Sequence, residues 1–142
     1  MSTDDCIFCK IVAGEVPSFK VYEDEHTLAF MDINPANRGH ALAIPKTHSP
    51  NLYETPDESL AVTIATARKV ARAVQKTVNP DGMNLVQANG PGAAQSVFHL
   101  HLHLIPRFMD DNLMLNWGVE PVPGDMDELR ELAGQIAANI ED

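Results

Sequence analysis

The segment SVFHLHLHLIPR, residues 96–107, carries three histidines at alternating positions, His99, His101 and His103, with leucines between them. In a β-strand, successive side chains point to opposite faces of the sheet. The three histidines would therefore share one face, and the leucines would share the other face and pack beneath a helix. Histidine is a rare residue, so this spacing favours a functional strand over a half-exposed strand that carries histidines by chance.

A single metal ion cannot easily bind all three histidines of such a strand. The chain rises about 3.3 Å per residue, which places His99 and His103 roughly 13 Å apart, whereas a metal–nitrogen bond measures about 2 Å. Two adjacent histidines of the set can share a metal ion. The three side chains are therefore expected to have different roles.

The loop that precedes the strand, NGPGAAQS (residues 89–96), is suited to an anionic ligand. Its small residues expose main-chain N–H groups, and Asn89, Gln95 and Ser96 add polar side chains. Such a loop can surround an anionic oxygen without added positive charge. A neutral imidazole is a nucleophile at pH 7 because its unperturbed pKa is near 6.5. A glycine-rich loop that leads directly into the alternating histidines thus predicts chemistry at a phosphoryl centre.

Further from the histidines, the sequence predicts an α+β domain. The strands follow one another in pairs with short connections, so the sheet is expected to be mainly antiparallel. Apolar runs bounded by turn residues predict five strands, at residues 18–24, 26–32, 40–45, 83–89 and 97–106.

The clearest predicted helix follows Thr55. Thr55 is expected to cap it, Pro56 to occupy its first position and Glu58 to complete a capping box. A short helical turn is predicted at residues 6–14. Apolar residues at helical spacing mark the buried face of the long helix (Leu60, Ile64, Ala67, Ala71, Val74 and Val78) and one face of a last helix (Leu129, Leu132, Ile136 and Ile140).

Composition limits the classes of protein and partner. The 142 residues suit a single domain spanning residues 1–142, and the hydrophobic content of 44% and charged content of 21% are those of a globular protein. No apolar run approaches the ~20 residues of a membrane span. The net charge of −10 argues against nucleic acid as a partner, but not against a single nucleotide. The N-terminus lacks the pattern of a signal peptide, so we expect a cytoplasmic protein.

The two cysteines, Cys6 and Cys9, form a C-x-x-C pair. In a reducing cytoplasm a structural disulfide is not expected. The pair can be part of a metal site, a redox pair or two ordinary residues. A thioredoxin-like motif is less favoured, because no predicted strand precedes it.

The stretch from His99 to Ile105 resembles the histidine triad (HIT) motif, H-φ-H-φ-H-φ-φ, where φ is an apolar residue. CIFCKIVAGEVPSFKVYED, AFMDINPANRGHALAIPKTH and NGPGAAQSVFHLHLHLIPR are similar to segments of this family and occur in its order. The resemblance extends from Cys6 to Arg107 and is strongest to the bacterial, Hint-like branch. The segment 108–142 matches no motif. The resemblance implies a HIT-like fold and a nucleotide-binding hydrolase or transferase that acts at the α-phosphate.

The resemblance also implies roles for matching residues. His101 would be the nucleophile and form a nucleotidyl-histidine intermediate, and His103 would bind phosphate oxygens. A nucleophilic imidazole must present one nitrogen lone pair to phosphorus, so the other N–H group of His101 is expected to be held by an acceptor such as a main-chain carbonyl. The remaining nucleotide contacts would be Asp32 with the ribose, Ile33 with the base, and Asn89, Gln95 and Ser96 with the phosphate. Ser96 could also assist the leaving group.

Further implications concern a metal site and two single residues, His40 and Ala94. Bacterial relatives with the same residues hold a structural zinc, which here would bind Cys6, Cys9, His48 and His99. His40 is expected to give a supporting hydrogen bond. Ala94 departs from the family pattern, in which glycine precedes the glutamine, so its methyl group could narrow the loop or alter φ.

The resemblance also implies a homodimer, in which two sheets join. Ala61 and Ala65 of the long helix lie outside its main apolar stripe and could take part in the contact between chains. The single tryptophan, Trp117, could serve in the core or in a subunit contact.

Four functions remain open from the sequence. The first is a nucleoside phosphoramidase-like hydrolase acting on a purine nucleotide joined to an amine, which the Ser96–Gln95 pair slightly favours. The second is a dinucleoside polyphosphate hydrolase. The third is a nucleotide-binding regulatory module with incidental slow hydrolysis. The fourth is a metal-dependent oxidase that uses H-x-H as ligands, which predicts a redox metal and no nucleotide binding.

Overall fold

The computed structural model describes residues 3–114 and 122–141 of the chain. Its contacts divide it into two compact units, one ending at Asn112 and the other beginning at Leu113. The N-terminal unit contains the sheet, the long helix and all three histidines of the alternating segment. Trp117 lies outside the described residues. No helix in the described part of the chain is long and apolar enough to cross a bilayer.

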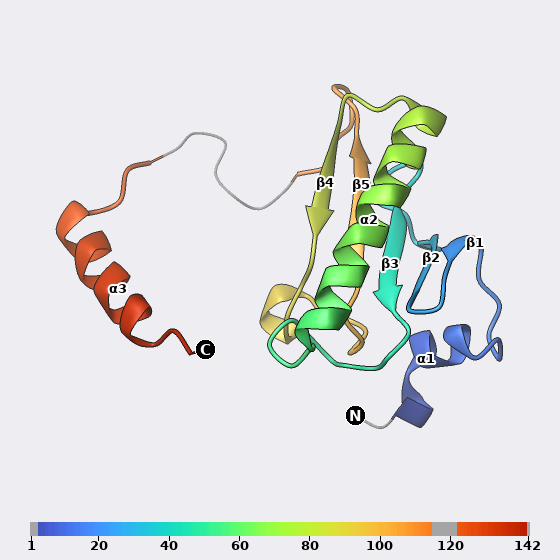
Figure 1. The fold of residues 1–142 in the computed structure, drawn as a ribbon. Coiled ribbons are helices and arrows are strands. Elements are labelled where there is room, and N and C mark those ends of the chain that lie inside the picture. Colours follow the sequence, from blue (N-terminus) through green and yellow to red (C-terminus); the bar gives the residue numbers. More distant parts are fainter. Residues whose placement is uncertain (1–2, 115–121, 142) are drawn as a thin grey trace. The chain divides into compact units, whose positions relative to one another are not determined.

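The N-terminal unit is built on one five-stranded antiparallel sheet with the order β1-β2-β3-β5-β4 (Figure 1). The predicted α+β class and antiparallel sheet are confirmed. Only β5 is placed out of chain order, between β3 and β4, so the histidine segment leads into the interior of the sheet. The strands are β1 (Lys20–Glu23), β2 (Thr27–Met31), β3 (Ala41–Pro45), β4 (Gly82–Val86) and β5 (Leu102–Arg107).

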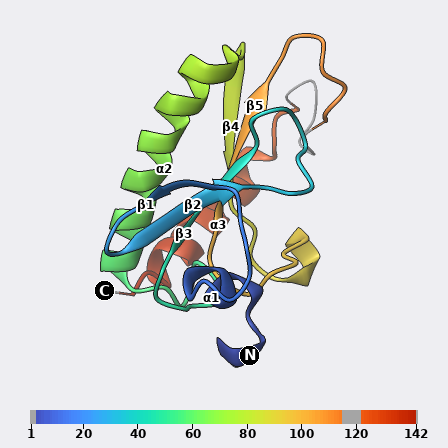
Figure 2. The same cartoon turned by 90° about the vertical axis from the view of Figure 1, so that its right-hand side faces the viewer.

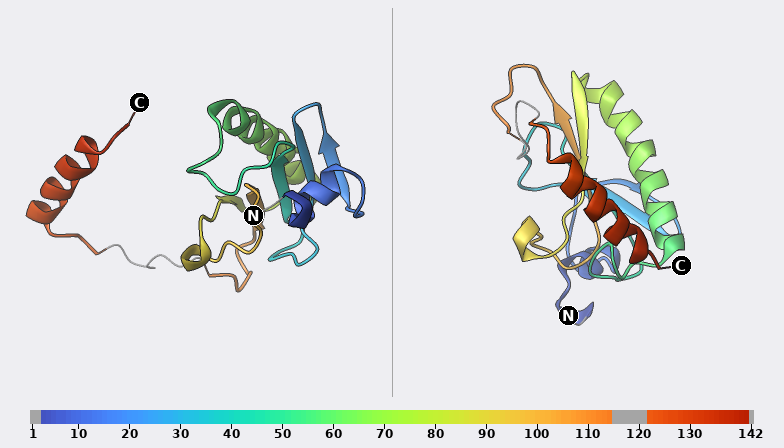
Figure 3. Two further views of the ribbon diagram at one scale, coloured as in Figure 1. Left: turned by 90° about the horizontal axis from the view of Figure 1, so that it is seen from below. Right: turned by 90° about the vertical axis from the view of Figure 1, so that its left-hand side faces the viewer.

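The two faces of the sheet bury residues of different size. The long helix α2 (Asp57–Val78) covers one face of the sheet (Figure 2). On that face, the small alanine side chains of β2 and β3 let the helix approach the sheet closely. On the other face, larger side chains such as Phe30 and Leu42 form a second cluster with Phe8 of the short helix α1 (Ile7–Val12). The left view of Figure 3 shows this helix from below. The alternation along β2 and β3 therefore gives the sheet one face for α2 and one for α1.

The predicted capping box of α2 is wrong. The helix begins at Asp57, and the position before it, Pro56, makes no side-chain capping bond. The Thr55 hydroxyl instead donates to the main-chain oxygen of Asn51, 2.5 Å away, and lies 2.9 Å from the Ser49 hydroxyl. Thr55 thus closes the preceding turn rather than the helix.

The buried face of α2 is also rotated from the predicted stripe. Ala67 and Val74 are buried as expected, but Ile64 is 47% exposed and Thr63 is fully buried. Threonine is tolerated there because its hydroxyl donates to the main-chain oxygen of Ser59 at 2.6 Å, and a buried polar group that is hydrogen-bonded costs little. Ile64 is left facing an open groove.

The strand that contains the histidines is shorter than predicted. β5 begins at Leu102, and its last pairing with β3 joins Leu102 to Ala43. Before that point the main chain leaves the ladder, because the N–H group of Leu100 donates to Ser49, 2.8 Å away. His99 and His101 therefore precede the strand, and only His103 lies in it. The strand predicted at residues 83–89 likewise ends early, at Val86.

The C-terminal unit contains the predicted last helix, α3 (Met126–Ala138). Asp125 caps it by accepting hydrogen bonds from the N–H groups of Asp127 and Glu128, at 2.9 and 3.1 Å. Ile140 lies beyond the end of α3, so it is not part of the helical face on which it was predicted.

Before α1, a short 3-10 helix, η1 (Thr3–Asp5), leads to Cys6. A second one, η2 (Pro91–Ala93), lies in the glycine-rich loop.

Candidate functional site

The side chain of His99 belongs to a cluster of sulfur and nitrogen atoms. It is fully buried, and burial lowers its pKa to about 4, so the ring is neutral at pH 7. Nε2 lies 2.8 Å from the main-chain oxygen of Pro45, which can only accept, so Nε2 carries the proton. Nδ1 is left with a lone pair, and it faces Cys6 at 3.4 Å and Cys9 at 3.6 Å.

Cys6, Cys9, His48 and His99 bring four potential ligand atoms within 4.8 Å of one another. His48 Nδ1 lies 3.3 Å from both Cys9 Sγ and His99 Nδ1. Tetrahedral zinc with Zn–S near 2.3 Å and Zn–N near 2.0 Å separates its ligand atoms by about 3.3–3.8 Å. The measured separations match those of a four-coordinate site.

The setting of Cys9 favours its neutral thiol as long as no cation is bound. Cys6 caps α1, and its sulfur accepts the N–H group of Cys9 at 3.3 Å. Burial, followed by the nearby Cys6, raises the pKa of Cys9 to about 11. A cation between the sulfurs would reverse this preference for the neutral thiol. The donor set is therefore a candidate metal site closed by protein atoms.

His101 presents a lone pair to a cavity. Its Nδ1 lies 2.7 Å from the main-chain oxygen of His99, so Nδ1 carries the proton and Nε2 does not. The expectation that a main-chain carbonyl holds one N–H group of His101 is confirmed for Nδ1. Burial lowers the pKa of His101, which keeps the ring neutral. The ring of Phe8 packs edge-on against it with centroids 5.1 Å apart.

His103 lies beside His101, with ring centroids 4.8 Å apart. Its Nδ1 is 3.0 Å from Nε2 of His40 and 3.9 Å from the carboxylate of Asp32. Burial, then the neighbouring His101 and His40, lower the pKa of His103 to about 4. The supporting hydrogen bond predicted for His40 is confirmed, and it goes to the third histidine of the motif.

His101 and His103 line a cavity of about 310 Å³. Ser96, Asp32 and Ile33 lie on the same cavity, so five of the residues predicted to contact the nucleotide meet there. Ile33 is 76% exposed, which leaves its side chain free to contact a ligand. The rest of the lining is largely apolar and includes Ile7, Phe8, Ile11, Phe30 and Leu42. An apolar pocket with a few convergent polar groups is the usual form of a small-molecule site.

Gln95 and Asn89 do not line this cavity. The Gln95 side chain is buried and braces the glycine-rich loop: Oε1 accepts from Gly90 at 2.7 Å, and Nε2 donates to Pro50 at 2.6 Å and to Val97 at 3.0 Å. A direct phosphate contact by Gln95 would require these bonds to rearrange, and it stays a prediction.

Asn89 also has a bracing position in the structure. Its Oδ1 accepts the N–H group of Leu52 at 2.8 Å, and its amide exchanges two hydrogen bonds with Gln87, at 2.7 and 2.8 Å. These bonds join the end of β4 to the segment before α2. The phosphate contact predicted for Asn89 likewise stays a prediction.

The residue that departs from the family pattern, Ala94, has left-handed backbone angles, φ 64° and ψ 31°. A side chain in this region costs about 1–2 kcal/mol, whereas glycine is free of the penalty but loses more chain entropy on folding. Ala94→Gly should therefore stabilise the protein by about 0.5–1 kcal/mol, measured by urea unfolding. Ala93→Gly, next to it in η2, is the control and should destabilise. An equal effect at both positions would contradict the argument.

The sequence reasoning did not identify Phe8 or the carbonyl of Pro45. Phe8 contacts the rings of both His99 and His101. Its position between the two cysteines was the only available signal. The Pro45 contact depends on how the end of β3 meets the histidine segment, which no local pattern reveals.

Comparison with known proteins identifies relatives across the chain. The family model of the HIT domain matches residues 13–110. The protein hit of Bacillus subtilis is 44% identical over 138 residues, which cover 96% of this chain and 95% of that protein. The adenosine 5'-monophosphoramidase of Saccharomyces cerevisiae is 41% identical, over 96% of this chain and 83% of that protein. The adenylylsulfatase of Arabidopsis thaliana is 39% identical, over 96% and 68%.

Solved structures agree with the sequence comparison. The crystal structure of a Streptococcus mutans protein is 47% identical with a TM-score of 0.92, covering 99% of this chain and 88% of that chain. A zinc-bound histidine triad family protein from Mycobacterium smegmatis is 39% identical with a TM-score of 0.74, covering 96% of this chain and 99% of that chain. These structures have the fold described above.

Proposed function

Because the chain belongs to the histidine triad (HIT) family, we propose that it hydrolyses purine nucleotide conjugates at the α-phosphate, as a nucleoside phosphoramidase-like enzyme. The observation that carries the proposal is the free Nε2 lone pair of His101, presented to a cavity that Asp32 and Ser96 also line. A buried, neutral imidazole with its other nitrogen held by a carbonyl is suited to nucleophilic attack.

The proposed reaction has two displacements at the α-phosphorus. In the first, His101 Nε2 forms a bond to phosphorus while the bond to the amine breaks, and the amine leaves with a proton that Ser96 can supply. The nucleotidyl-histidine keeps its proton on Nδ1, hydrogen-bonded to the oxygen of His99. In the second, water attacks phosphorus and returns a proton to Ser96 while the bond from phosphorus to His101 Nε2 breaks, which releases the nucleotide and restores the Nε2 lone pair. His103 stabilises negative charge on the phosphoryl oxygens in both steps.

The remainder of the cavity suits the nucleoside. Asp32, which lines the cavity, would accept hydrogen bonds from ribose hydroxyls, and Ile33 with the apolar lining would contact the base. The cavity volume of about 310 Å³ is at the lower end of the range for ligand sites. A single nucleotide unit is therefore favoured as the enclosed part of the substrate.

The leaving group separates the two hydrolase alternatives. Two relatives are named for an adenosine phosphoramidate and for adenylyl sulfate, in which a small group is attached to an adenylate. These names favour a small leaving group over a second nucleotide. The dinucleoside polyphosphate hydrolase remains the second candidate, since the same attack by His101 would serve it.

A panel of conjugates tests the proposal. Purified protein should release AMP from adenosine 5'-phosphoramidate with a higher kcat/KM than from diadenosine polyphosphates. The opposite order would favour the dinucleoside polyphosphate hydrolase. Tight mononucleotide binding with negligible turnover would favour the regulatory module, and a redox metal without nucleotide binding would favour the oxidase.

We propose that the closed cluster of Cys6, Cys9, His48 and His99 holds a structural zinc. The ligand separations and the two sulfurs support this metal, and a zinc-bound relative exists in the same family. With all four positions filled by protein atoms, the ion would tie together the N-terminal segment, the end of β3 and the chain before β5. Its chemistry would be the binding of thiolates and imidazoles, apart from the phosphoryl reaction.

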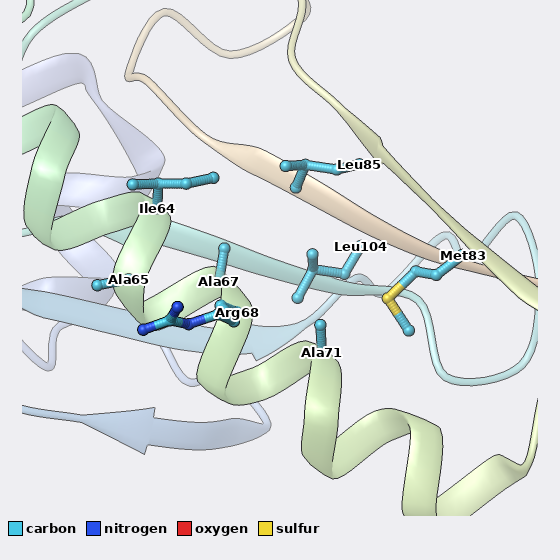
Figure 4. Close-up of a pocket in the computed structure, with 8 residues that line it drawn as sticks. All are labelled: Ile64, Ala65, Ala67, Arg68, Ala71, Met83, Leu85 and Leu104. Carbon is cyan, nitrogen blue, oxygen red and sulfur yellow. The ribbon is translucent and has the colours of Figure 1, made fainter.

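We also propose a homodimer. A groove of about 520 Å³ lies between α2 and the edge strand β4, away from the histidines (Figure 4). Its lining includes Ile64, 47% exposed, Leu85, 50% exposed, and Ala65, one of the alanines outside the predicted stripe. An open sheet edge beside exposed apolar side chains favours pairing with a second copy of the same surface.

Sedimentation tests the dimer. At micromolar concentration the protein should sediment with about twice the 15.5 kDa chain mass, and Leu85→Lys should shift it toward one chain because a charge enters the apolar contact. Leu52→Lys, at a side chain of similar exposure outside the groove, is the control and should leave the mass unchanged. A monomeric wild-type protein would rule out the dimer. Cytoplasmic location stays a prediction.

A further inference from the structure

The side chain of His40 contacts both the carboxylate of Asp32 and the third histidine of the motif. It directly precedes β3 and is 4% exposed. Its Nδ1 lies 2.9 Å from the main-chain nitrogen of Ala36. Its Nε2 lies 3.0 Å from Nδ1 of His103 and 3.4 Å from the carboxylate of Asp32. Both nitrogens of His40 therefore have a partner in the folded protein.

These contacts fix the protons of two imidazoles in turn. A main-chain N–H group can only donate, so Nδ1 of His40 must accept from Ala36, and the single proton of a neutral ring lies on Nε2. Nε2–H then donates to its nearest acceptor, Nδ1 of His103. Because that nitrogen accepts, the proton of neutral His103 lies on Nε2. Burial lowers the pKa of both His40 and His103, which keeps the two rings neutral.

The outcome is opposite to the one at His101. The carbonyl of His99 draws the His101 proton to Nδ1 and leaves a lone pair on Nε2. At His103, Nδ1 accepts the proton of His40 Nε2 and therefore keeps its lone pair, so the proton of His103 is on Nε2. Two adjacent histidines on one cavity thus offer one nucleophile and one hydrogen-bond donor.

We propose that His40 is a positioning residue that holds the proton of His103 on Nε2, so that His103 acts as a hydrogen-bond donor to the phosphoryl oxygens. This inference rests on the proposed function for its catalytic consequence, but the position of the proton can be tested without any substrate. It explains why a fourth, buried histidine, from the position just before β3, is hydrogen-bonded to the motif.

The nearby carboxylate of Asp32 is the reason that His103 needs the hydrogen bond from His40. Its carboxylate lies 3.9 Å from Nδ1 of His103 and can only accept hydrogen bonds. Without the N–H group of His40 in place, the carboxylate would draw the His103 proton to Nδ1. The Nε2 lone pair would then face the negatively charged phosphoryl oxygens and repel them.

Two amide substitutions separate the two hydrogen bonds of His40. In His40→Asn, the shorter amide takes the place of Nδ1, so it can still accept from Ala36 but cannot reach His103. In His40→Gln, the longer amide takes the place of Nε2 and can still donate to His103, but it gives up the bond from Ala36. Each variant keeps one contact and is the matched control for the other.

The first readout is the tautomer of His103, seen in long-range ¹H–¹⁵N correlation spectra of the free protein. Wild type and His40→Gln should show the proton on Nε2, and His40→Asn should shift it to Nδ1. The second readout is stability. Loss of the Ala36 bond should make His40→Gln the less stable of the two variants.

The third readout is turnover of adenosine 5'-phosphoramidate. His40→Asn should lose about 10²-fold in kcat with a much smaller change in KM, near the cost of removing one donor to a developing oxyanion. His40→Gln should stay within about threefold of wild type. A purely structural role for His40 would instead make activity follow stability.

Several results would overturn the inference. They are a wild-type His103 proton on Nδ1, an unchanged tautomer in His40→Asn, or a changed tautomer with unchanged kcat. If wild-type protein hydrolyses no conjugate, the proposed function fails, but the spectra still decide whether His40 sets the proton of His103.

Discussion

Replacing His101 with asparagine should lower kcat on adenosine 5'-phosphoramidate by about 10⁴-fold or more, the scale seen when an enzyme loses its nucleophile. Asparagine cannot form the phosphorus–nitrogen bond that His101 Nε2 would form. Its amide can still donate to the main-chain oxygen of His99, as His101 Nδ1 does in the structure at 2.7 Å. The cavity should therefore keep its shape, and the affinity for AMP should change little.

His103→Ala is the comparison for that variant. It removes a donor instead of the nucleophile, so it should cost less in kcat, and it should also weaken mononucleotide binding. Quenching in base during turnover, which preserves the acid-labile phosphorus–nitrogen bond, followed by peptide mapping at alkaline pH, should place the nucleotidyl group on His101 of the wild-type protein. Near-normal turnover by His101→Asn, or a nucleotidyl group on His99 or His103, would show that the nucleophile is assigned wrongly.

The alternating histidines were enough to predict different roles for the three side chains, because the reach of one metal ion is short compared with the rise of a strand. The structure places the three imidazoles in different surroundings, but not all in one strand. Only His103 lies in β5, while His99 and His101 precede it. The proton positions of His99 and His101 are set by the main-chain carbonyls of Pro45 and His99, which accept their protons.

The parts of the fold that follow local rules were predictable. Apolar runs bounded by turn residues identified β2 and β3, and helical spacing identified α2 and α3. The predictions failed where a threonine side chain made a different local hydrogen bond from the one that its sequence position suggested. Thr55 has the chemistry of a helix cap but closes a turn with Asn51 instead. Thr63 is buried because a hydrogen bond to Ser59 satisfies its hydroxyl.

The glycine-rich loop shows why polar residues at a site are difficult to assign from sequence. Gln95 and Ser96 are neighbours and were both predicted to contact phosphate. In the structure Ser96 lines the cavity, whereas Gln95 holds the loop through three hydrogen bonds. Which of two adjacent side chains points to the ligand depends on the path of the loop, which here includes a left-handed residue, Ala94.

The second large effect is expected when the metal cluster is broken by the double change Cys6→Ser, Cys9→Ser. A ligand present at about 1,000 times its Kd stabilises the folded state by about 4 kcal/mol. Loss of the stabilisation that the bound metal gives should lower Tm by roughly 10–15 °C for a chain of this size. Nucleotide affinity should stay mostly intact, because none of the four cluster residues lines the cavity.

Chelation distinguishes loss of the metal from damage caused by the serines themselves. A strong chelator should lower the Tm of wild-type protein by nearly the same amount, and it should have no further effect on the double variant. Elemental analysis should find about one zinc per wild-type chain and almost none in the variant. If metal-replete wild-type protein contains no zinc, the cluster is only a set of packed side chains. The buried His99 would then owe its orientation to the hydrogen bond with Pro45 and to packing against Phe8 and His48, and the carbonyl that holds His101 would be fixed without any metal.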